Sequence, residues 1–593
     1  MTKGRRKLAK INKYTMILTI AIIFWAIYFL SIGVANPIYL NMKNTDPLAM
    51  IRSLFPLYYM AVALFVFFCF GCVLFRIRNK YIHIALLVQL SVMLWLTPYY
   101  LSGFSYVNDS LYHVGVSSNI PEVLKGYVTS DIYDYGKDYP LSFVFNNLFM
   151  EISGVDPFTY AYLIYPTLYV ITIILLLYAF ISRFLEHRVA FLSIIFAILG
   201  LGYVAQIHVS PRSAGTILLL VAVILLISFR DIKSHALGLL VSFLMIATHP
   251  ISPLILVLFC LALYITKFAS RHVRSWFSTS GIISIFVAWF AYTFFAITRR
   301  GAEIAEALYK IVTLEFATEL QDITTRASSV HYLYPEINIL SKIVDYSILI
   351  IALILIGHLI AIFYSIGLDP TKGRKELLLE VRSKIRFEEL FFLATALLCF
   401  PFSILLNLSG QGVGGLYERS YFYFVFTIAV YIGLNVQGKK ICSLRRTWKK
   451  YLMFSLVVWF TFIALIYPLK AYPNYSYEAY PPSEGLGMQF VSSSVRLNGK
   501  MISMYLYFQL ASYISPETHF SSDYYELSDF SVSKPYPEII VFRKSMYFDI
   551  ALRYDLSLND NRYLQAISEV NNLTDFNRVY SNPTFNVYIK TFG

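Results

Sequence analysis

The long uninterrupted apolar stretches of this chain restrict its fold more than any other feature. Stretches of about 20 apolar residues can cross the hydrocarbon core of a bilayer as α-helices, because a helix satisfies its own backbone hydrogen bonds there. Of the 593 residues, 58% are hydrophobic and only 14% are charged, which is outside the usual range of soluble globular proteins. The pattern predicts a polytopic α-helical membrane protein with about 13 transmembrane helices.

The predicted spans follow one another closely along the first 468 residues. They lie at residues 16–35, 55–75, 81–101, 158–180, 189–207, 214–229, 236–248, 251–265, 281–297, 343–366, 390–408, 420–434 and 451–467. His249 and Pro250 separate two of them, because a proline interrupts the hydrogen bonding of a helix.

Basic residues are grouped between alternate predicted spans, as in proteins that keep lysine and arginine on the cytoplasmic side. One group precedes the first span, and others lie at residues 76–80, 183–188, 230–233, 267–274, 372–386 and 439–450. This arrangement predicts a multi-pass protein of the cell membrane with a cytoplasmic N-terminus. The formal net charge of +14 then reflects topology and contact with membrane lipids, and no nucleic-acid partner is expected.

Two domains follow from this division. Residues 1–468 form the transmembrane domain, with long outer loops at 102–157 and 298–342. An odd number of crossings places residues 469–593 outside the membrane, opposite the cytoplasmic loops.

The outer segment 469–593 has a different composition from the rest of the chain. Its β-branched and aromatic runs at 538–542 and 585–589 are typical of strands, and 561–570 is typical of a helix. We therefore expect a small C-terminal extracytoplasmic α/β domain with its own core.

The outer loop at 102–157 carries an acidic cluster in an otherwise apolar chain. Asp109 is followed by His113 and then by Asp131, Asp134 and Asp138. Asp109 could act as a general base, with His113 one helical turn away assisting it or sharing a divalent metal. The alternatives are that Asp109 caps a helix, that His113 is packed or solvated, and that the later aspartates are surface charges.

Other polar residues lie at the outer ends of several predicted spans and could bind a substrate on the same face as Asp109. They are His208, Arg212, His249, Arg299, Arg300, Glu418 and Arg419. Arginines bind phosphate through paired N–H donors, which suits an anionic, lipid-linked donor. The alternatives are that His249 bonds to backbone freed at the helix break and that Arg419 is an interfacial anchor.

At these residues the chain resembles the GT-C superfamily of membrane glycosyltransferases, which use polyprenyl-phosphate-linked sugars. The superfamily includes protein O-mannosyltransferases, aminoarabinose transferases and oligosaccharyltransferases. The similarity lies in the many spans, the acidic loop with Asp109, the segment Tyr139-Pro140-Leu141, the segment Glu418-Arg419-Ser420-Tyr421-Phe422 and the outer C-terminal domain. The resemblance implies that Asp109 activates the acceptor and that Arg419 contacts the lipid phosphate.

Two features depart from that family. Its catalytic loop usually follows the first span, whereas two further predicted spans precede Asp109 here. The oligosaccharyltransferase signature Trp-Trp-Asp-Tyr-Gly is missing from the C-terminal segment, and only Asp134-Tyr135-Gly136 repeats part of it. The missing signature argues against transfer of a whole glycan to asparagine, whereas the position of the loop bears on whether Asp109 is equivalent to the catalytic carboxylate of the family.

The expected function is inverting transfer of a sugar from a polyprenyl-phosphate carrier to a protein, lipid or glycan hydroxyl on the outer face. No organic cofactor is required, because the glycosyl-phosphate bond supplies the energy, and a divalent metal is an open alternative. Two other functions remain open: a transporter or lipid flippase, and a non-catalytic protein that assembles envelope glycans.

Overall fold

The computed structural model describes most of the N-terminal half of the chain and selected segments beyond it. The described residues are 3–34, 54, 56–75, 77, 79–102, 108–126, 134–201, 207–229, 231–269, 279–297, 302, 357, 387–408, 416–437, 446–471, 525–526, 531–532, 539–543, 576–582 and 585–590.

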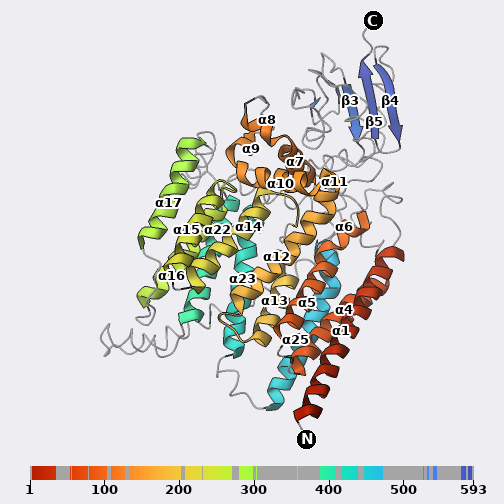
Figure 1. Cartoon of the computed structure of the whole chain (residues 1–593), viewed down its shortest axis with the longest axis vertical. Helices are drawn as coiled ribbons and strands as arrows, with labels where there is room; N and C mark the ends of the chain where they lie inside the picture. Colours follow the sequence, from red (N-terminus) through yellow and green to blue (C-terminus); the bar gives the residue numbers. More distant parts are fainter. Residues whose placement is uncertain are drawn as a thin grey trace.

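Long helices whose axes lie roughly along a common line make up most of the described residues (Figure 1). They are α1 (Lys3–Val34), α4 (Pro56–Leu74), α5 (Lys80–Ser91), α12 (Tyr165–Ile181), α13 (His187–Leu201), α14 (Pro211–Val223), α15 (Ile232–Ile246), α16 (Ser252–Ala269), α17 (Thr279–Ala291), α22 (Phe387–Leu408), α23 (Leu416–Gln437) and α25 (Arg446–Ala471). Short π-helical turns extend four of them: η1 (Val92–Leu96) with α6 (Thr97–Ser102) after α5, η3 (Tyr160–Ile164) before α12, η5 (Ile224–Ser228) after α14 and η6 (Tyr292–Ala296) after α17.

The helices have the composition that the sequence predicts. Four described segments are long and apolar enough to cross a membrane: Tyr14–Val34, Pro56–Leu74, Lys80–Leu101 and Tyr160–Ile181. Shorter apolar helices follow, among them those at Pro211–Ile227 and Ser252–Thr266. Every predicted span except 343–366, of which only residue 357 is described, overlaps a helix with described bounds. The structure therefore agrees with a helical protein that associates with membranes.

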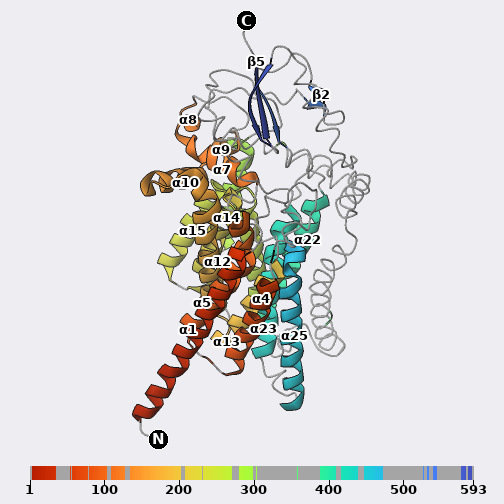
Figure 2. The ribbon, with the colours of Figure 1, turned by 90° about the vertical axis from the view of Figure 1, so that its right-hand side faces the viewer.

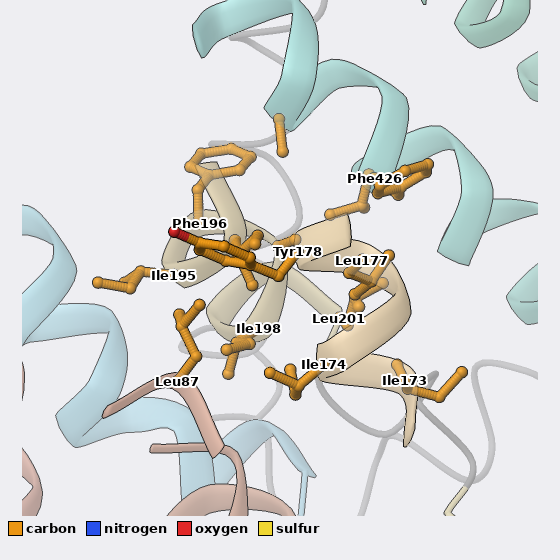
Figure 3. Close-up of a cluster of buried hydrophobic side chains, with 14 of the residues drawn as sticks. Leu87, Ile173, Ile174, Leu177, Tyr178, Ile195, Phe196, Ile198, Leu201 and Phe426 are labelled. Carbon is orange, nitrogen blue, oxygen red and sulfur yellow. The ribbon is translucent and has the colours of Figure 1, made fainter. Parts of the chain in front are cut away.

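The helices pack through a continuous apolar core. Figure 3 shows part of this core, in which side chains of α12 and α13 lie between Leu87 of α5 and Phe426 of α23. Ile174 and Ile198 are both fully buried there. In a bilayer such contacts stabilise the bundle through close packing, because lipid tails are as apolar as the side chains themselves.

A layer of shorter helices covers one end of the bundle (Figures 1 and 2). It consists of α7 (Asn108–Ser118), α8 (Ile120–Leu124), α9 (Asp134–Asp138), α10 (Pro140–Ser153) and α11 (Pro157–Thr159). Pro140 begins α10, where its fixed φ suits a first turn, and Gly154 ends it with a φ of 65°. We call this layer the cap layer.

Two hydrogen bonds to backbone carbonyls attach the cap layer to the ends of α15 and α17. The N–H of Leu141 donates to the carbonyl of Ala247, just after α15, at 3.3 Å. The hydroxyl of Tyr292 in η6 donates to the carbonyl of Asp138 at 2.7 Å. The start of α10 and the end of α9 are therefore held against the ends of α15 and α17.

The C-terminal segment contains the strands that the sequence predicts. The strands β3 (Ile539–Arg543), β4 (Phe576–Asn582) and β5 (Phe585–Lys590) form an antiparallel sheet in the order β3-β5-β4. A separate antiparallel pair joins β1 (Tyr525–Glu526) to β2 (Ser531–Val532). The strands predicted at 538–542 and 585–589 are confirmed, and the helix predicted at 561–570 lies outside the described residues. The sheet lies at the same end of the molecule as the cap layer (Figure 1).

We expect Gly238→Ala to destabilise the fold, because α15 approaches η5 closely at this glycine. A Cβ at position 238 would lie 2.8 Å from Cγ of Leu226 and 3.2 Å from Cβ of Leu225. The overpacking should cost about 1–3 kcal/mol in unfolding free energy, measured by thermal unfolding of the purified protein in detergent. Gly71→Ala is the matched control, since an added Cβ there meets nothing within 4 Å. Equal unfolding midpoints for the two variants would contradict the prediction.

Candidate functional site

The helix α7 carries the predicted catalytic pair. It begins at Asn108, so Asp109 lies in the first turn, where the positive end of the helix dipole favours a carboxylate. The structure describes the backbone of Asp109 and the whole of His113. Because both residues lie within one helix, positions 109 and 113 share a face, as predicted.

The ring of His113 is packed among aromatic side chains. Its exposed fraction is 9%, and its centroid lies 5.0 Å from that of Tyr112, 5.7 Å from Phe143 and 6.2 Å from Tyr135. This is the packed environment that the sequence left open as the alternative to a catalytic role. His113 therefore helps to join α7 to α9 and α10.

The later aspartates fall in and around α9. Asp131 lies outside the described residues, and the structure gives only the backbone of Asp134, at the start of α9. Asp138 ends α9 half-buried, with its carbonyl bonded to Tyr292. The structure thus ties Asp138 to the end of α17 through its main chain.

The turn before α14 is closely bonded and places Arg212 at a helix N-terminus. Ser210 caps the helix: its hydroxyl oxygen accepts from the N–H of Ser213 at 3.2 Å. The hydroxyl of Ser213 donates to the carbonyl of His208 at 2.7 Å. His208 is 5% exposed, and Arg212 is half-buried. These bonds fix the backbone from which Arg212 projects.

Buried hydroxyl groups lie around Arg212. Its positive charge is close enough to Tyr169 of α12 and Tyr423 of α23 to favour the ionised form of both phenols. The hydroxyl of Tyr423 lies 3.2 Å from that of Thr216, one turn further along α14. An arginine in such surroundings presents several donors at the end of an apolar helix, which is a favourable arrangement for an anion.

His249 lies beside the same turn of α14. It is 2% exposed, and its Nδ1 accepts from the N–H of Ser252 at 3.2 Å and lies 2.9 Å from the hydroxyl of Ser252. This confirms the interpretation in which His249 bonds to backbone freed at the helix break. Gly215 allows the approach, because a Cβ there would lie 2.9 Å from Cβ of His249.

A series of hydrogen bonds joins α7, through α10, to η3 before α12. The hydroxyl of Ser117 donates to the carbonyl of His113 at 2.7 Å, and the amide of Asn146 donates to Ser117 at 3.5 Å. The hydroxyl of Tyr160 donates to Oδ1 of Asn146 at 2.8 Å. The rings of Tyr160 and Tyr165 are 5.7 Å apart.

The structure therefore brings His208, Arg212 and His249 to one end of the bundle, beneath the cap layer that carries Asp109. Sequence reasoning missed other buried polar side chains of the same region: Asn146, Tyr160, Tyr165, Tyr169 and Tyr423. The signal available was their hydrogen-bonding capacity inside apolar segments, since buried polar groups are normally bonded.

The remaining predicted residues are only partly described. Arg299 and Arg300 lie outside the described residues, and the structure gives the backbone of Glu418 and Arg419 in the first turn of α23. Position 419 precedes Tyr423 by four residues and so shares its helical face. Within the described part of the chain, no group of three or more His, Cys, Asp or Glu residues could hold a metal ion.

We expect Asn146→Ala to destabilise the protein by about 1–3 kcal/mol, because it leaves the buried hydroxyl of Tyr160 without its acceptor. Thermal unfolding in detergent measures the loss. Asn147→Ala is the matched control: Asn147 is similarly buried, 7% exposed against 4%, but it bonds to the exposed Glu151. A loss as large for Asn147→Ala as for Asn146→Ala would contradict the proposed importance of the link between α10 and η3.

No protein-family model matches this sequence, and no curated protein matches it significantly.

Proposed function

We propose that this protein is an integral-membrane, GT-C-like glycosyltransferase that moves a sugar from a polyprenyl-phosphate carrier to a hydroxyl acceptor by an inverting mechanism. The observation that carries the proposal is the position of Arg212. It is half-buried at the N-terminus of α14, in the electrostatic neighbourhood of Tyr169 and Tyr423, at the end of the bundle that the cap layer covers.

This position suits the phosphate of a lipid carrier better than a free soluble anion. The isoprenoid chain of such a carrier lies in the bilayer, so its phosphate is presented where apolar helices end. A charged side chain close to the hydrocarbon is costly and usually marks a substrate site or an ion pair. Arg212 combines that location with a capped helix N-terminus, which also favours negative charge.

The chemistry assigned to Asp109 is general-base catalysis. Its carboxylate takes the proton of the acceptor hydroxyl while the acceptor oxygen forms a bond to the anomeric carbon. The bond between that carbon and the phosphate oxygen breaks, and its electron pair leaves on the polyprenyl phosphate, whose charge Arg212 stabilises. The series from Ser117 through Asn146 and Tyr160 fixes α7, the helix of the base, to η3 at the start of α12.

The proposed topology has multiple passes, with a cytoplasmic N-terminus and the cap layer outside. Its support is the distribution of charge along the helices. Lys80 begins α5, Arg183 follows α12 and Lys233 lies in the first turn of α15, each at the end of its helix opposite the cap layer. Lysine and arginine concentrate on the cytoplasmic side of membrane proteins. The C-terminal sheet then belongs to a small extracytoplasmic α/β domain of residues 469–593.

Asp109→Asn should lower the rate of sugar release from a radiolabelled polyprenyl-phosphate sugar by about 100- to 10,000-fold, which is the usual contribution of a general base. The purified protein in phospholipid nanodiscs is the sample, and both free and acceptor-bound sugar are counted. Asp231→Asn is the control. Asp231 caps α15 and is fully exposed, and hydrogen bonds from Ser234 lower the pKa of its carboxyl group.

Asparagine keeps the cap at position 231, so that control should retain full activity. Wild-type activity of Asp109→Asn would overturn the role of Asp109. Movement of intact donor across a vesicle membrane without cleavage would instead favour a transporter or flippase.

Arg212→Gln should weaken binding of polyprenyl phosphate by about 10- to 100-fold, since a hydrogen bond to a charged group contributes about 1.5–3 kcal/mol. Arg212→Lys should restore part of the affinity, because it keeps the charge but loses the paired donors. Arg183→Gln is the control: Arg183 lies over the ring of Phe229, near the other end of the helices. Equal affinities for Arg212→Gln and wild type would remove Arg212 from the phosphate site.

A further inference from the structure

The helix α10 exposes its large apolar side chains and buries polar ones. Phe145, Leu148 and Ile152 have exposed fractions of 65%, 49% and 85%. Their spacing of three and four residues puts them on one face of the helix. We call these three residues the outer face of α10. A surface helix in contact with water shows the reverse pattern, with polar side chains outward.

The opposite face of α10 is fixed to the protein. Phe143 is fully buried and Met150 is 6% exposed. Asn146, at the edge of that face, bonds to Ser117 of α7 and to Tyr160 of η3. The helix α10 is therefore already packed against the protein through its opposite face, and the outer face stays exposed in that packed position.

The position of α10 aligns its outer face with the apolar sides of the bundle. Figure 2 shows α10 lying across the end of the bundle and projecting beyond the side on which α15 lies. Its first turn is bonded to Ala247, just after α15. The helix α15 exposes Leu240 (53%), Phe243 (43%) and Leu244 (40%) along its length. The outer face thus continues the surface that α15 presents to acyl chains.

Aromatic residues with polar groups mark the same level of the molecule. The indole N–H of Trp289 donates to the carbonyl of Pro250 at 2.7 Å, and Tyr292 bonds to Asp138. Tyr160 and Tyr165 lie at the start of α12. Trp289, Tyr160 and Tyr165 are buried, so these residues fix the end of the bundle next to α10 and are not a lipid-facing aromatic belt.

We infer that α10 is an interfacial helix, which lies in the outer leaflet of the bilayer with Phe145, Leu148 and Ile152 among the upper acyl chains of phospholipids. The inference requires that the bundle crosses a membrane but is independent of glycosyl transfer. Glu151, to which Asn147 donates at 2.8 Å, lies at the border of the outer face and is exposed, as expected for a side chain at headgroup level. Lipid contact then determines the position of α10 along the membrane normal, and also that of α7, which packs against α10.

The test is paired footprinting of the wild-type protein in vesicles of phosphatidylcholine and phosphatidylglycerol. One reagent is a phospholipid that generates a carbene in its acyl chain, and the other is the hydroxyl radical in water. Adducts on the outer face should match those on Leu240 and Phe243 and exceed those on Leu124 and Lys125 by about tenfold, as for a helix with its apolar face buried in the interface. Oxidation by hydroxyl radical should show the reverse order.

Other outcomes have clear meanings. Oxidation of the outer face without carbene adducts would show that water covers it, and protection from both reagents would show that protein covers it; either result overturns the inference. Failure to label Leu240 and Phe243 would instead overturn the membrane crossing itself. Sugar release is not measured, so failure of the proposed function is a separate result.

A double variant, Leu148→Gln with Ile152→Gln, tests whether these side chains hold α10 in the lipid. Carbene adducts on Phe145 should fall several-fold, and its oxidation should rise. Leu124→Gln, at a similarly exposed position of α8 (52%), is the matched control and should leave both readings on Phe145 unchanged. Unchanged labelling of Phe145 in the double variant would contradict the lipid anchoring of α10.

Discussion

The structure depends on one requirement: hydrogen-bonding groups that lie in an apolar bundle must be satisfied by the chain itself. Several hydroxyl groups inside the described helices meet it by bonding to the carbonyl four residues earlier. Thr97 donates to Met93 at 2.6 Å, and Thr427 donates to Tyr423 at 2.8 Å. Without water, an unsatisfied group of this kind costs free energy comparable to a lost hydrogen bond or more. The same requirement determines which side chains occur at helix breaks, because backbone groups there lack a helical partner.

At the helix breaks, side chains replace the missing backbone partners. Ser210 accepts from Ser213 before α14, and His249 accepts from Ser252 before α16. The two breaks lie together, because Gly215 lets the second one approach α14. Polar residues that each satisfy one helix end are in this way gathered around Arg212. The candidate site thus forms because several apolar helices end at the same level, and each end requires polar side chains.

The helices could be predicted because the length and composition of an apolar stretch decide on their own whether it forms a membrane-type helix. The strands β3 and β5 could be predicted from their β-branched and aromatic residues. The link from Ser117 through Asn146 to Tyr160 could not, because it depends on how α10 turns about its axis after it docks. The role of His113 was ambiguous for the same reason: spacing gives its helical face but not the aromatic rings that surround it. The catalytic role of Asp109 stays a prediction.

The cap on α16 also determines the protonation chemistry of His249. A ring nitrogen that accepts a hydrogen bond from a backbone N–H cannot carry a proton of its own, so in the neutral imidazole the proton belongs to Nε2. Nε2 can then give a hydrogen bond but not receive one. As long as α16 keeps its cap, neutral His249 can act at Nε2 only as a hydrogen-bond donor, and it is excluded there as a base that accepts a proton.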